Sequence, residues 1–277
     1  MPSLDIERRR FADRMVHGIG GDTQRLRDAF AATAREDFVG LPPWPLLGSD
    51  LGRVWSDDPR ELYQDVLVGL DAERGINNGQ PSLHARCLAA CDPRPGETVL
   101  HVGAGTGYYS AILAQLVGPR GAVIAYEIET DLAARAAANL KPWPQASVRA
   151  VSGVVPPLPA CDVIYVNAGA THPIAAWLDA LRDGARLMFP LTPDEGSGCM
   201  LLVTRGPRGA YAARSLMRVA FIGCIGARDP AASAALRRAF ASGSVDAVRS
   251  LHRDDEPDES AWCVGHGWWL STGAPPA

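Results

Sequence analysis

The clearest chemical signal in the chain is the segment Gly103-Ala104-Gly105-Thr106-Gly107. The apolar residues from Val99 to Val102 lead directly into it, and a helix pattern follows. Glycines permit a tight turn with positive φ and let a ligand approach the backbone, and the first turn of a helix offers free N–H groups. The sequence therefore predicts a ligand-binding loop between a buried strand and a helix.

An acidic residue at a suitable distance narrows the class of ligand. Glu127 ends the next predicted strand, 20 residues after Gly107. Rossmann-type folds place there an acid that accepts hydrogen bonds from ribose hydroxyls. The glycine spacing is G-x-G-x-G, whereas the G-x-G-x-x-G of dinucleotide enzymes seats a pyrophosphate on the helix. We therefore expect the phosphate-free cofactor S-adenosyl-L-methionine; the alternative is a plain tight turn with a surface glutamate.

Other polar side chains follow the predicted strand at 162–166. Asn167 and His172 come after that strand, at the carboxyl edge of the sheet. Ligands of open α/β sheets bind at this edge, so both residues are candidates for the catalytic site. The alternative is that both residues only cap a helix or form part of a turn.

Histidines and tyrosines near the loop are further candidates. His101, in the strand before the loop, and His84 join His172 as candidate bases if the methyl acceptor is a hydroxyl. Tyr108 and Tyr109 follow the loop directly. Either one packs beside the cofactor, or both belong to the core or the helix surface.

The elements that must position these residues alternate along the middle of the chain. Strands are predicted at 98–102, 122–127, 147–151, 162–166, 186–191 and 199–204. Helices are predicted at 107–117, 130–140 and 173–182. This alternation indicates a parallel sheet with crossover helices. The predicted fold class is α/β, a Rossmann-like doubly wound and mostly parallel sheet with N-terminal helices and a C-terminal extension.

The flanking regions are expected to be less regular. Before the core, the sequence predicts helices at 4–18 and from Asp22 or Thr23 to 35, an irregular loop at 41–60, a mixed stretch at 61–79, and a helix from Pro81 to 90. After it, the sequence predicts a long strand near the sheet edge at 211–224, a helical stretch at 230–251, a solvated acidic loop at 254–259, and a final strand at 262–270.

Three regions follow from this pattern. They are an N-terminal helical and loop region at 1–79, a cofactor-binding methyltransferase core at 80–225, and a C-terminal helical extension with a terminal strand at 226–277.

Composition restricts the partners that we expect. The 277-residue chain carries a net charge of −4, and Lys141 is its only lysine, which argues against nucleic-acid binding. No apolar run reaches the roughly 18 residues of a membrane helix, and no signal-peptide core is visible, so we expect a cytoplasmic protein without membrane contact.

The cysteines point to buried thiols. The six cysteines form no C-x-x-C pair, and a chain of this size needs no disulfides. His84, Cys87 and Cys91 share a predicted helix face and are a conceivable zinc set. No second ligand cluster accompanies them, so no metal is expected.

Several segments resemble the protein-L-isoaspartate O-methyltransferase family between about residue 8 and about residue 205. Residues 29–39 resemble its segment ending V-P-R-E-x-F-V, Tyr63-Gln64-Asp65 its Y-x-D, and residues 80–85 the segment before its first core helix. Residues 100–108 match its cofactor loop, and residues 189–191 resemble its strand-five ending. The order and spacing of these segments make the resemblance fairly specific.

The resemblance implies the fold, the cofactor and a set of contacts. The cofactor-binding residues expected from it and from the loop are Gln80, His84, Gly103, Ala104, Gly105, Thr106, Gly107, Tyr108, Glu127 and Ser152.

Three departures from the family pattern put isoaspartyl repair in doubt. The family reads T-I-S where this chain has Asn77-Asn78-Gly79, so the serine hydroxyl is missing. The family's acid before the glycine loop is His101 here, and its G-D-G appears as Val151-Ser152-Gly153. We expect slow isoaspartyl methylation, with a gain in Gly79→Ser if the backbone tolerates a Cβ atom there.

The sequence shows no obvious pair of residues for acid–base catalysis. This favours a carboxylate as the methyl acceptor, because a carboxylate is already ionised at pH 7 and needs no general base. The preferred function is carboxyl O-methylation of a protein or peptide by a methyltransferase. A methyltransferase of a small-molecule acceptor is one alternative. A non-catalytic module that binds S-adenosyl-L-methionine is the other.

Overall fold

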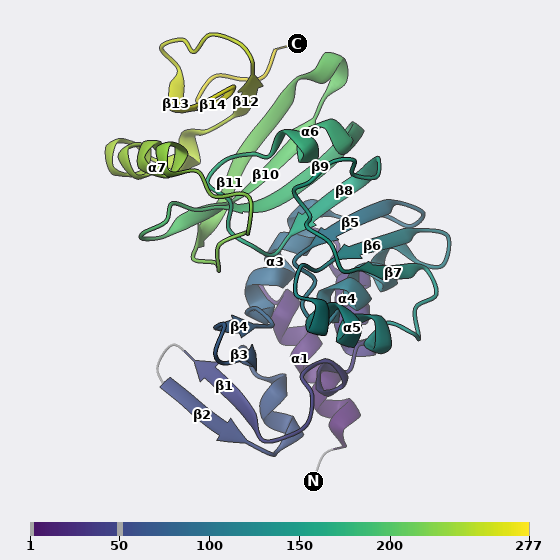
Figure 1. The fold of residues 1–277 in the computed structure, drawn as a ribbon. Coiled ribbons are helices and arrows are strands. Elements are labelled where there is room, and N and C mark those ends of the chain that lie inside the picture. The colour runs from purple at the N-terminus through teal and green to yellow at the C-terminus, as the bar shows by residue number, and fades with distance from the viewer. Residues whose placement is uncertain (1–2, 49–51, 277) are drawn as a thin grey trace. The chain divides into compact units, whose positions relative to one another are not determined.

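The computed structural model describes residues 3–48 and 52–276 (Figure 1). They fall into two compact units that we describe separately. Unit one comprises residues 1–97 and 104–151, and unit two comprises residues 98–103 and 152–277.

Unit one contains the main helices before and after the glycine loop. They are α1 (Leu4–Val16), α2 (Gln24–Ala32), α3 (Pro81–Cys91), α4 (Tyr108–Val117) and α5 (Thr130–Asn139), with short 3₁₀ helices η1 (Arg35–Phe38) and η2 (Pro59–Tyr63). Phe11 of α1 and Phe30 of α2 are fully buried and pack edge to face, with ring centroids 6.1 Å apart. These helices confirm the predicted ones, within a few residues at their ends.

The start of α3 depends on two residues far apart in sequence. Pro81 occupies the first turn, where a missing N–H costs nothing. Asp65 accepts the Ser82 N–H at 2.8 Å and its hydroxyl at 2.6 Å, and so it satisfies a donor that the helix leaves free.

The prediction of an irregular loop at 41–60 is wrong. β1 (Trp44–Gly48) and β2 (Gly52–Ser56) form an antiparallel pair, and β3 (Leu67–Asp71) and β4 (Ile76–Asn77) complete a sheet of order β2-β1-β3-β4. Trp44 and Leu46 alternate into a cluster with Val39, Leu62 and Val68. This burial fixes the strand although prolines and glycines surround it.

Unit one also holds β6 (Ala122–Tyr126) and β7 (Ala146–Arg149), which pair in parallel. In unit two, β5 (Thr98–Val102) pairs in parallel with β8 (Cys161–Val166), and β8 pairs in parallel with β9 (Leu181–Leu191). The residues of β5 and β8 are almost all buried, as expected for parallel strands covered on both faces. The α/β fold class with parallel central strands is therefore confirmed.

The rest of unit two is antiparallel. Its strand order runs β5-β8-β9-β10-β11-β12-β14-β13, where the new members are β10 (Gly198–Arg205), β11 (Tyr211–Val219), β12 (Ser250–Arg253), β13 (Ala261–Gly265) and β14 (Trp268–Ser271). The helices are α6 (Ala175–Ala180), α7 (Pro230–Ser242), η3 (Pro207–Gly209) and η4 (Val245–Ala247).

Several predictions for the C-terminal part need correction. The strand predicted near the sheet edge at 211–224 ends at Val219 and lies inside the sheet, because β12 pairs with it. The helical stretch predicted at 230–251 stops at Ser242, before Gly243, and is followed by a strand. The single strand predicted at 262–270 is a hairpin that turns at His266-Gly267, where Gly267 has a positive φ of 71°.

All six cysteines are buried and none forms a disulfide within the described residues, in agreement with the prediction that they act as small hydrophobic residues. In the described part of the chain, no group of three or more His, Cys, Asp or Glu side chains is arranged to hold a metal ion. Among the described helices, none combines the length and apolar character needed to cross a bilayer.

Candidate active site

The glycine loop of unit one is bonded directly to the acid that the sequence singles out. The Gly105 N–H donates to Glu127 Oε2 at 2.6 Å, and the Glu129 N–H donates to Glu127 Oε1 at 3.0 Å. Glu127 follows β6 and is only 6% exposed. Burial raises the pKa of its carboxyl, and these N–H donors oppose the rise. Glu127 is therefore a buried acceptor at the loop and not a surface acid.

The glycines are required by backbone conformation. Gly105 has a φ of 56° and Gly107 a φ of 95°, a region that L-residues with a side chain rarely adopt. Of the described residues that are not its chain neighbours, a Cβ atom on Gly105 would contact only Leu70, at 3.5 Å from Cδ1. One side of Gly105 is therefore open apart from Leu70. Gly103, which follows β5 in unit two, also has a positive φ, of 74°.

Two buried polar atoms in this loop have no hydrogen-bond partner among the described residues. They are the hydroxyls of Thr106 and Tyr108. A buried hydroxyl without a partner costs free energy, and a bound ligand or water removes that cost. The open face of Gly105, the buried Glu127 carboxylate and the unpaired Thr106 hydroxyl together fit a nucleoside ligand with ribose hydroxyls.

Tyr108 and Tyr109 have different surroundings. The Tyr108 ring packs edge to face on Phe38, with centroids 5.5 Å apart, inside the core of unit one. The Tyr109 ring stacks on His84 at 3.8 Å and 26°. The Tyr108 ring therefore packs in the core, which was one of the two alternatives for this residue. The Tyr109 ring packs against the imidazole of His84.

The His84 ring occupies the space that a side chain at position 79 would need. His84 is 1% exposed, and a Cβ atom on Gly79 would lie 2.3 Å from its Nε2 atom. Gly79 also has a positive φ of 73°, and its carbonyl accepts from the Tyr109 hydroxyl at 3.4 Å. A gain of activity in Gly79→Ser was expected only if the backbone tolerates a Cβ atom at this position. The structure leaves no room for one, so the gain is no longer expected.

The segment before Gly79 is held by its two asparagines. Asn77 Oδ1 accepts the Gly79 N–H at 3.0 Å. Asn78 Oδ1 accepts the Val68 N–H at 3.0 Å and an Arg35 Nη2 donor at 3.1 Å. The segment from Asn77 to Gly79 is therefore held in place by side-chain hydrogen bonds.

Sequence reasoning gave no role to Arg35, which is fully buried. Its guanidinium donates to the carbonyls of Leu62 at 2.6 Å, Gln64 at 3.2 Å and Val66 at 2.6 Å. Arg35 thus fixes the chain that leads to Gln80, whose side-chain amide donates to Asp65 at 2.8 Å. The only available signal was the place of Arg35 in the family-like segment 29–39.

In unit two, the structure brings His101 and Asn167 together. Asn167 Nδ2 lies 2.9 Å from His101 Nε2, at the carboxyl ends of β8 and β5. His101 is fully buried, and burial lowers its pKa to about 3. It is therefore neutral near pH 7, and a proton would be costly on its ring. A role as general base is poorly supported.

His172 and Ser152 lie on nearby loops of the same unit. His172 Nδ1 is 3.1 Å from the Thr171 hydroxyl, and burial lowers the pKa of His172 while Asp229 opposes that shift. The Ser152 hydroxyl accepts the Val154 N–H at 3.4 Å. Neither contact identifies a catalytic or cofactor role, so both assignments stay predictions.

The end of β8 is lined by segment 221–228, whose first four residues were predicted to belong to a strand. The Gly169 N–H donates to the Ile222 carbonyl at 2.7 Å, and the Cys224 N–H donates to the Gly169 carbonyl at 2.8 Å. Arg228 secures this region by donating to the Gly169 carbonyl and to Thr192. Segment 221–228 therefore lies at the carboxyl edge of the parallel strands.

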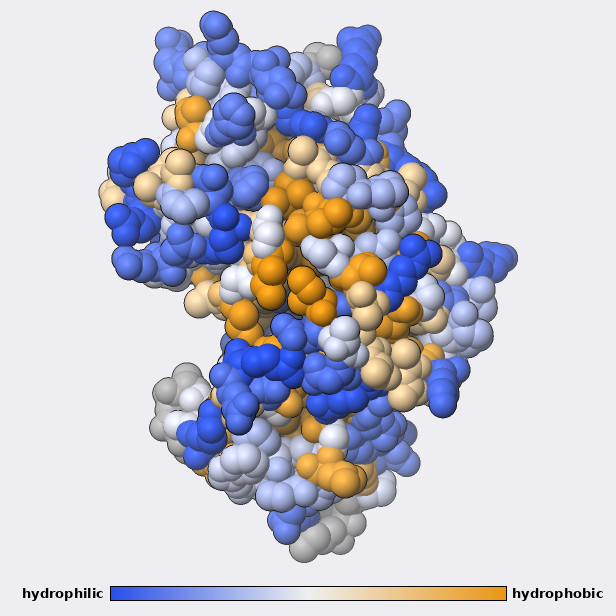
Figure 2. Space-filling model, in the orientation of Figure 1, coloured by the Kyte–Doolittle hydropathy of each residue, from blue (hydrophilic) through white to orange (hydrophobic). Residues whose placement is uncertain are grey.

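Unit two also has exposed apolar side chains. Figure 2 shows hydrophobic residues gathered on one face of the molecule. Unit two contributes Val155 at 59% exposure, Ile222 at 47% and Ile225 at 60%. Exposed apolar groups of this kind are typical of surfaces that bind another molecule.

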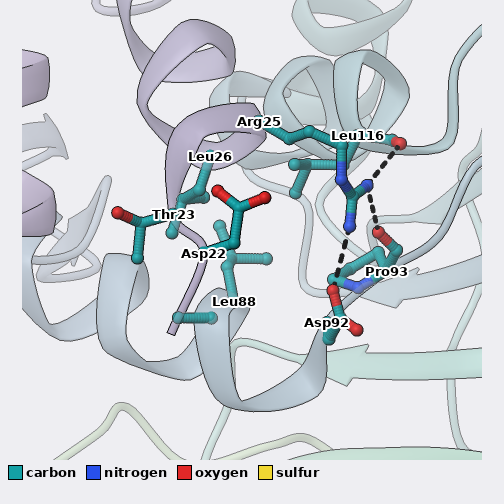
Figure 3. Close-up of a pocket in the computed structure, with 9 residues that line it drawn as sticks. Asp22, Thr23, Arg25, Leu26, Leu88, Asp92, Pro93 and Leu116 are labelled. Carbon is teal, nitrogen blue, oxygen red and sulfur yellow. Dashed lines mark hydrogen bonds and ion pairs between the residues drawn. The ribbon is translucent and has the colours of Figure 1, made fainter. Parts of the chain in front are cut away.

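A separate hollow in unit one is structural. Arg25 donates to the carbonyls of Pro93 at 3.0 Å and Leu116 at 3.3 Å and forms an ion pair with Asp92 (Figure 3). Leu116 is in the last turn of α4, whereas the glycine loop precedes its first turn. Arg25 supplies donors to carbonyls near the ends of α3 and α4, and this explains the hollow without a ligand.

Comparison with known proteins assigns the family. The model of the Protein-L-isoaspartate(D-aspartate) O-methyltransferase family matches residues 15–229. This chain belongs to that family. The resemblance noted in the sequence is thereby confirmed, and it extends past residue 205 to residue 229.

Individual relatives of the family agree. The Aeropyrum pernix protein-L-isoaspartate O-methyltransferase is 36% identical over 213 residues, which cover 74% of each chain. The enzyme of the same name from Ignicoccus hospitalis is 33% identical over 172 residues, which cover 59% of this chain and 80% of the relative.

Solved structures support the fold. A protein-L-isoaspartate O-methyltransferase superposes with a TM-score of 0.66 at 22% identity, over 78% of this chain and 65% of that chain. A Plasmodium falciparum protein described with the same activity, solved with S-adenosyl-L-homocysteine, gives a TM-score of 0.62 at 18% identity and covers 78% and 97%. This chain thus spans just under two thirds of the first structure.

Proposed function

We propose that this chain is an S-adenosyl-L-methionine-dependent O-methyltransferase that methylates a carboxylate of a protein or peptide, of the isoaspartyl type for which its family is named. The observation that carries the proposal is the buried Glu127 carboxylate bonded to the Gly105 N–H in an open, positive-φ glycine loop. Family membership from residue 15 to residue 229 supports the same cofactor and reaction.

Glu127, Gly105 and Gln80 are the groups that we assign to the cofactor. When bound, S-adenosyl-L-methionine supplies a methyl group on a positively charged sulfur. The Glu127 oxygens accept hydrogen bonds from the ribose hydroxyls, and Gly105 leaves the backbone accessible. Asp65 orients the Gln80 amide. These residues hold the cofactor in place for an in-line transfer, which depends on position more than on acid–base chemistry.

The acceptor needs no proton removal if it is a carboxylate, since a carboxylate is ionised near pH 7. The structure agrees with this requirement, because burial keeps His101 neutral and its ring is paired with Asn167. The exposed apolar side chains of Val155, Ile222 and Ile225 in unit two are of a kind that could bind a peptide.

The other two functions considered from the sequence, a small-molecule methyltransferase and a non-catalytic binding module, receive no additional support. The relatives carry the name of an enzyme that acts on a protein group, which gives no support to a small-molecule acceptor. Membership of a family named for an O-methyltransferase argues against a module that binds without turnover.

Calorimetry with S-adenosyl-L-homocysteine tests the cofactor assignment. We expect micromolar or tighter binding, about −8 kcal/mol. Gly105→Val should abolish it, because a branched side chain fills the open face at Leu70 and is strained at a φ of 56°. A wild-type protein that is folded and yet binds no S-adenosyl-L-homocysteine would rule out the proposed function.

A further inference from the structure

A hairpin of unit one lies against the glycine loop. β3 and β4 pair through Gly69 with Asn77 and through Asp71 with Ile76, and they turn at residues 72–75 (Figure 1). Among the described residues, and apart from the neighbours of Gly105 in the chain, only Leu70 on β3 lies within 4 Å of the position that a Gly105 Cβ atom would take. The face of Gly105 that a nucleoside would approach is therefore bounded by this hairpin.

The turn of the hairpin carries one arginine that contacts three carboxylates. Arg74 Nε donates to Asp71 Oδ2 at 2.9 Å, and this contact stays within the hairpin. Arg74 also donates to Asp131 Oδ2 at 2.8 Å and to Glu129. Glu129 and Asp131 belong to the start of α5, more than 50 residues further along the chain. The ion pairs thus connect the hairpin to α5.

These contacts end next to the ribose-binding acid. Glu129, which Arg74 binds through its side chain, donates its own backbone N–H to Glu127 Oε1 at 3.0 Å. The carboxylates raise the pKa of Arg74, and Arg74 lowers the pKa of Asp71 and Asp131. The arginine is about one third exposed, so salt in solution reaches it.

An isolated surface ion pair contributes little to stability. Arg10 with Glu7 on α1 is such a pair, since both residues lie on one helix three positions apart. The contacts of Arg74 differ because they form a network and close a hairpin over a neighbouring loop. Their effect is expected on the opening of the hairpin and not on the free energy of unfolding.

We propose that Arg74 is a positioning residue that latches the β3–β4 hairpin over the bound adenosyl cofactor through Glu129 and Asp131. The inference rests on the proposed function. With the latch closed, Leu70 would cover a cofactor bound at Gly105 and would help to exclude water from it. The cofactor product leaves after the ion pairs break, so its dissociation rate rises with salt.

The test measures the dissociation rate of radiolabelled S-adenosyl-L-homocysteine, chased with unlabelled compound, at low and high salt. At low salt, Arg74→Gln should dissociate about fivefold faster than wild type, as loss of a small ion-pair network implies. Arg74→Lys, which keeps the charge, should lie between them. Arg10→Gln, the matched control, should match wild type, and all variants should unfold at the same temperature within about 2 °C.

A double-mutant cycle tests whether Arg74 and Asp131 act through the same contact. Asp131→Asn should accelerate dissociation, and adding it to Arg74→Gln should change little, because both act through one contact. High salt should bring wild type close to Arg74→Gln. Equal dissociation rates for wild type and Arg74→Gln, or additive effects in the cycle, would overturn the latch while the cofactor assignment stands. Absence of binding to wild type would overturn both.

Discussion

At the scale of single residues, Glu127 is the most important side chain of the proposed cofactor site. Its two oxygens already hold the loop through the N–H groups of Gly105 and Glu129. Removing the side chain would therefore loosen the loop as well as the ligand, whereas Glu127→Gln keeps the size of the side chain and one of its two accepting oxygens. Loss of charge-assisted hydrogen bonds worth roughly 1.5–3 kcal/mol should weaken S-adenosyl-L-homocysteine binding about ten- to a hundredfold, as measured by calorimetry. Unchanged affinity would contradict a ribose-binding role.

The pH dependence of binding provides a second check on Glu127. Burial raises the pKa of this carboxyl, so it takes up a proton at a higher pH than an exposed glutamate does. The ionised form accepts the ribose hydroxyls. Affinity should therefore fall as the pH drops through this raised pKa, and Glu127→Gln should show no such fall. A wild-type affinity that is flat down to pH 4 would count against the assignment.

Gly79 gives the sharpest steric prediction. A Cβ atom there would lie 2.3 Å from His84 Nε2, and the backbone φ is 73°. Gly79→Ser and Gly79→Ala should therefore both lower methyl transfer by displacing His84 from Tyr109. Initial rates with one isoaspartyl peptide make the comparison, and a Gly79→Ser variant as active as wild type would contradict it.

At the scale of elements, Arg35 organises the approach to the site. It is buried and donates to three backbone carbonyls between Leu62 and Val66. Arg35→Met keeps much of the bulk but leaves these carbonyls unpaired, so the free energy of unfolding should fall by about 2–4 kcal/mol. Arg10→Met on the surface of α1 should change it by less than about 0.5 kcal/mol. Denaturant titration of both variants tests this, and a neutral Arg35→Met would contradict an anchoring role.

The sequence made the parallel strands and the loop predictable for a physical reason. Buried strands such as Val99 to Val102 are short apolar runs, and the glycines and Glu127 follow them at distances set by the chain itself. Contacts between distant segments carry no comparable signal. Arg35 with Asn78, and Arg74 with Asp131, become neighbours only when the elements pack.

Element errors also have identifiable causes. Pro45 and the surrounding glycines suggested a loop, but burial of Trp44 and Leu46 stabilises a strand there. The helical pattern after Pro230 was extended too far, because Gly243 ends the helix and Ser250 to Arg253 pair with β14. The role of each catalytic candidate was less predictable, since the neutral state of His101 depends on its complete burial.

At the scale of the whole molecule, the family assignment covers residues 15–229, and α7 with β12 to β14 follows beyond it. The three-region division predicted from the sequence remains a prediction. The cofactor loop retains the features expected of the family, whereas the segment at Asn77 to Gly79 departs from them. The reaction is therefore expected to be retained, and the rate on the acceptor is expected to be low.

The most direct test of the central claim is transfer of a labelled methyl group from S-adenosyl-L-methionine to an isoaspartyl peptide. The matched controls are the same peptide with an ordinary aspartyl residue and the Gly105→Val variant. The account predicts slow, base-labile labelling of the isoaspartyl peptide by wild type, and none in either control. Wild-type protein that binds S-adenosyl-L-homocysteine yet labels neither peptide, or labels both equally, would contradict the claim.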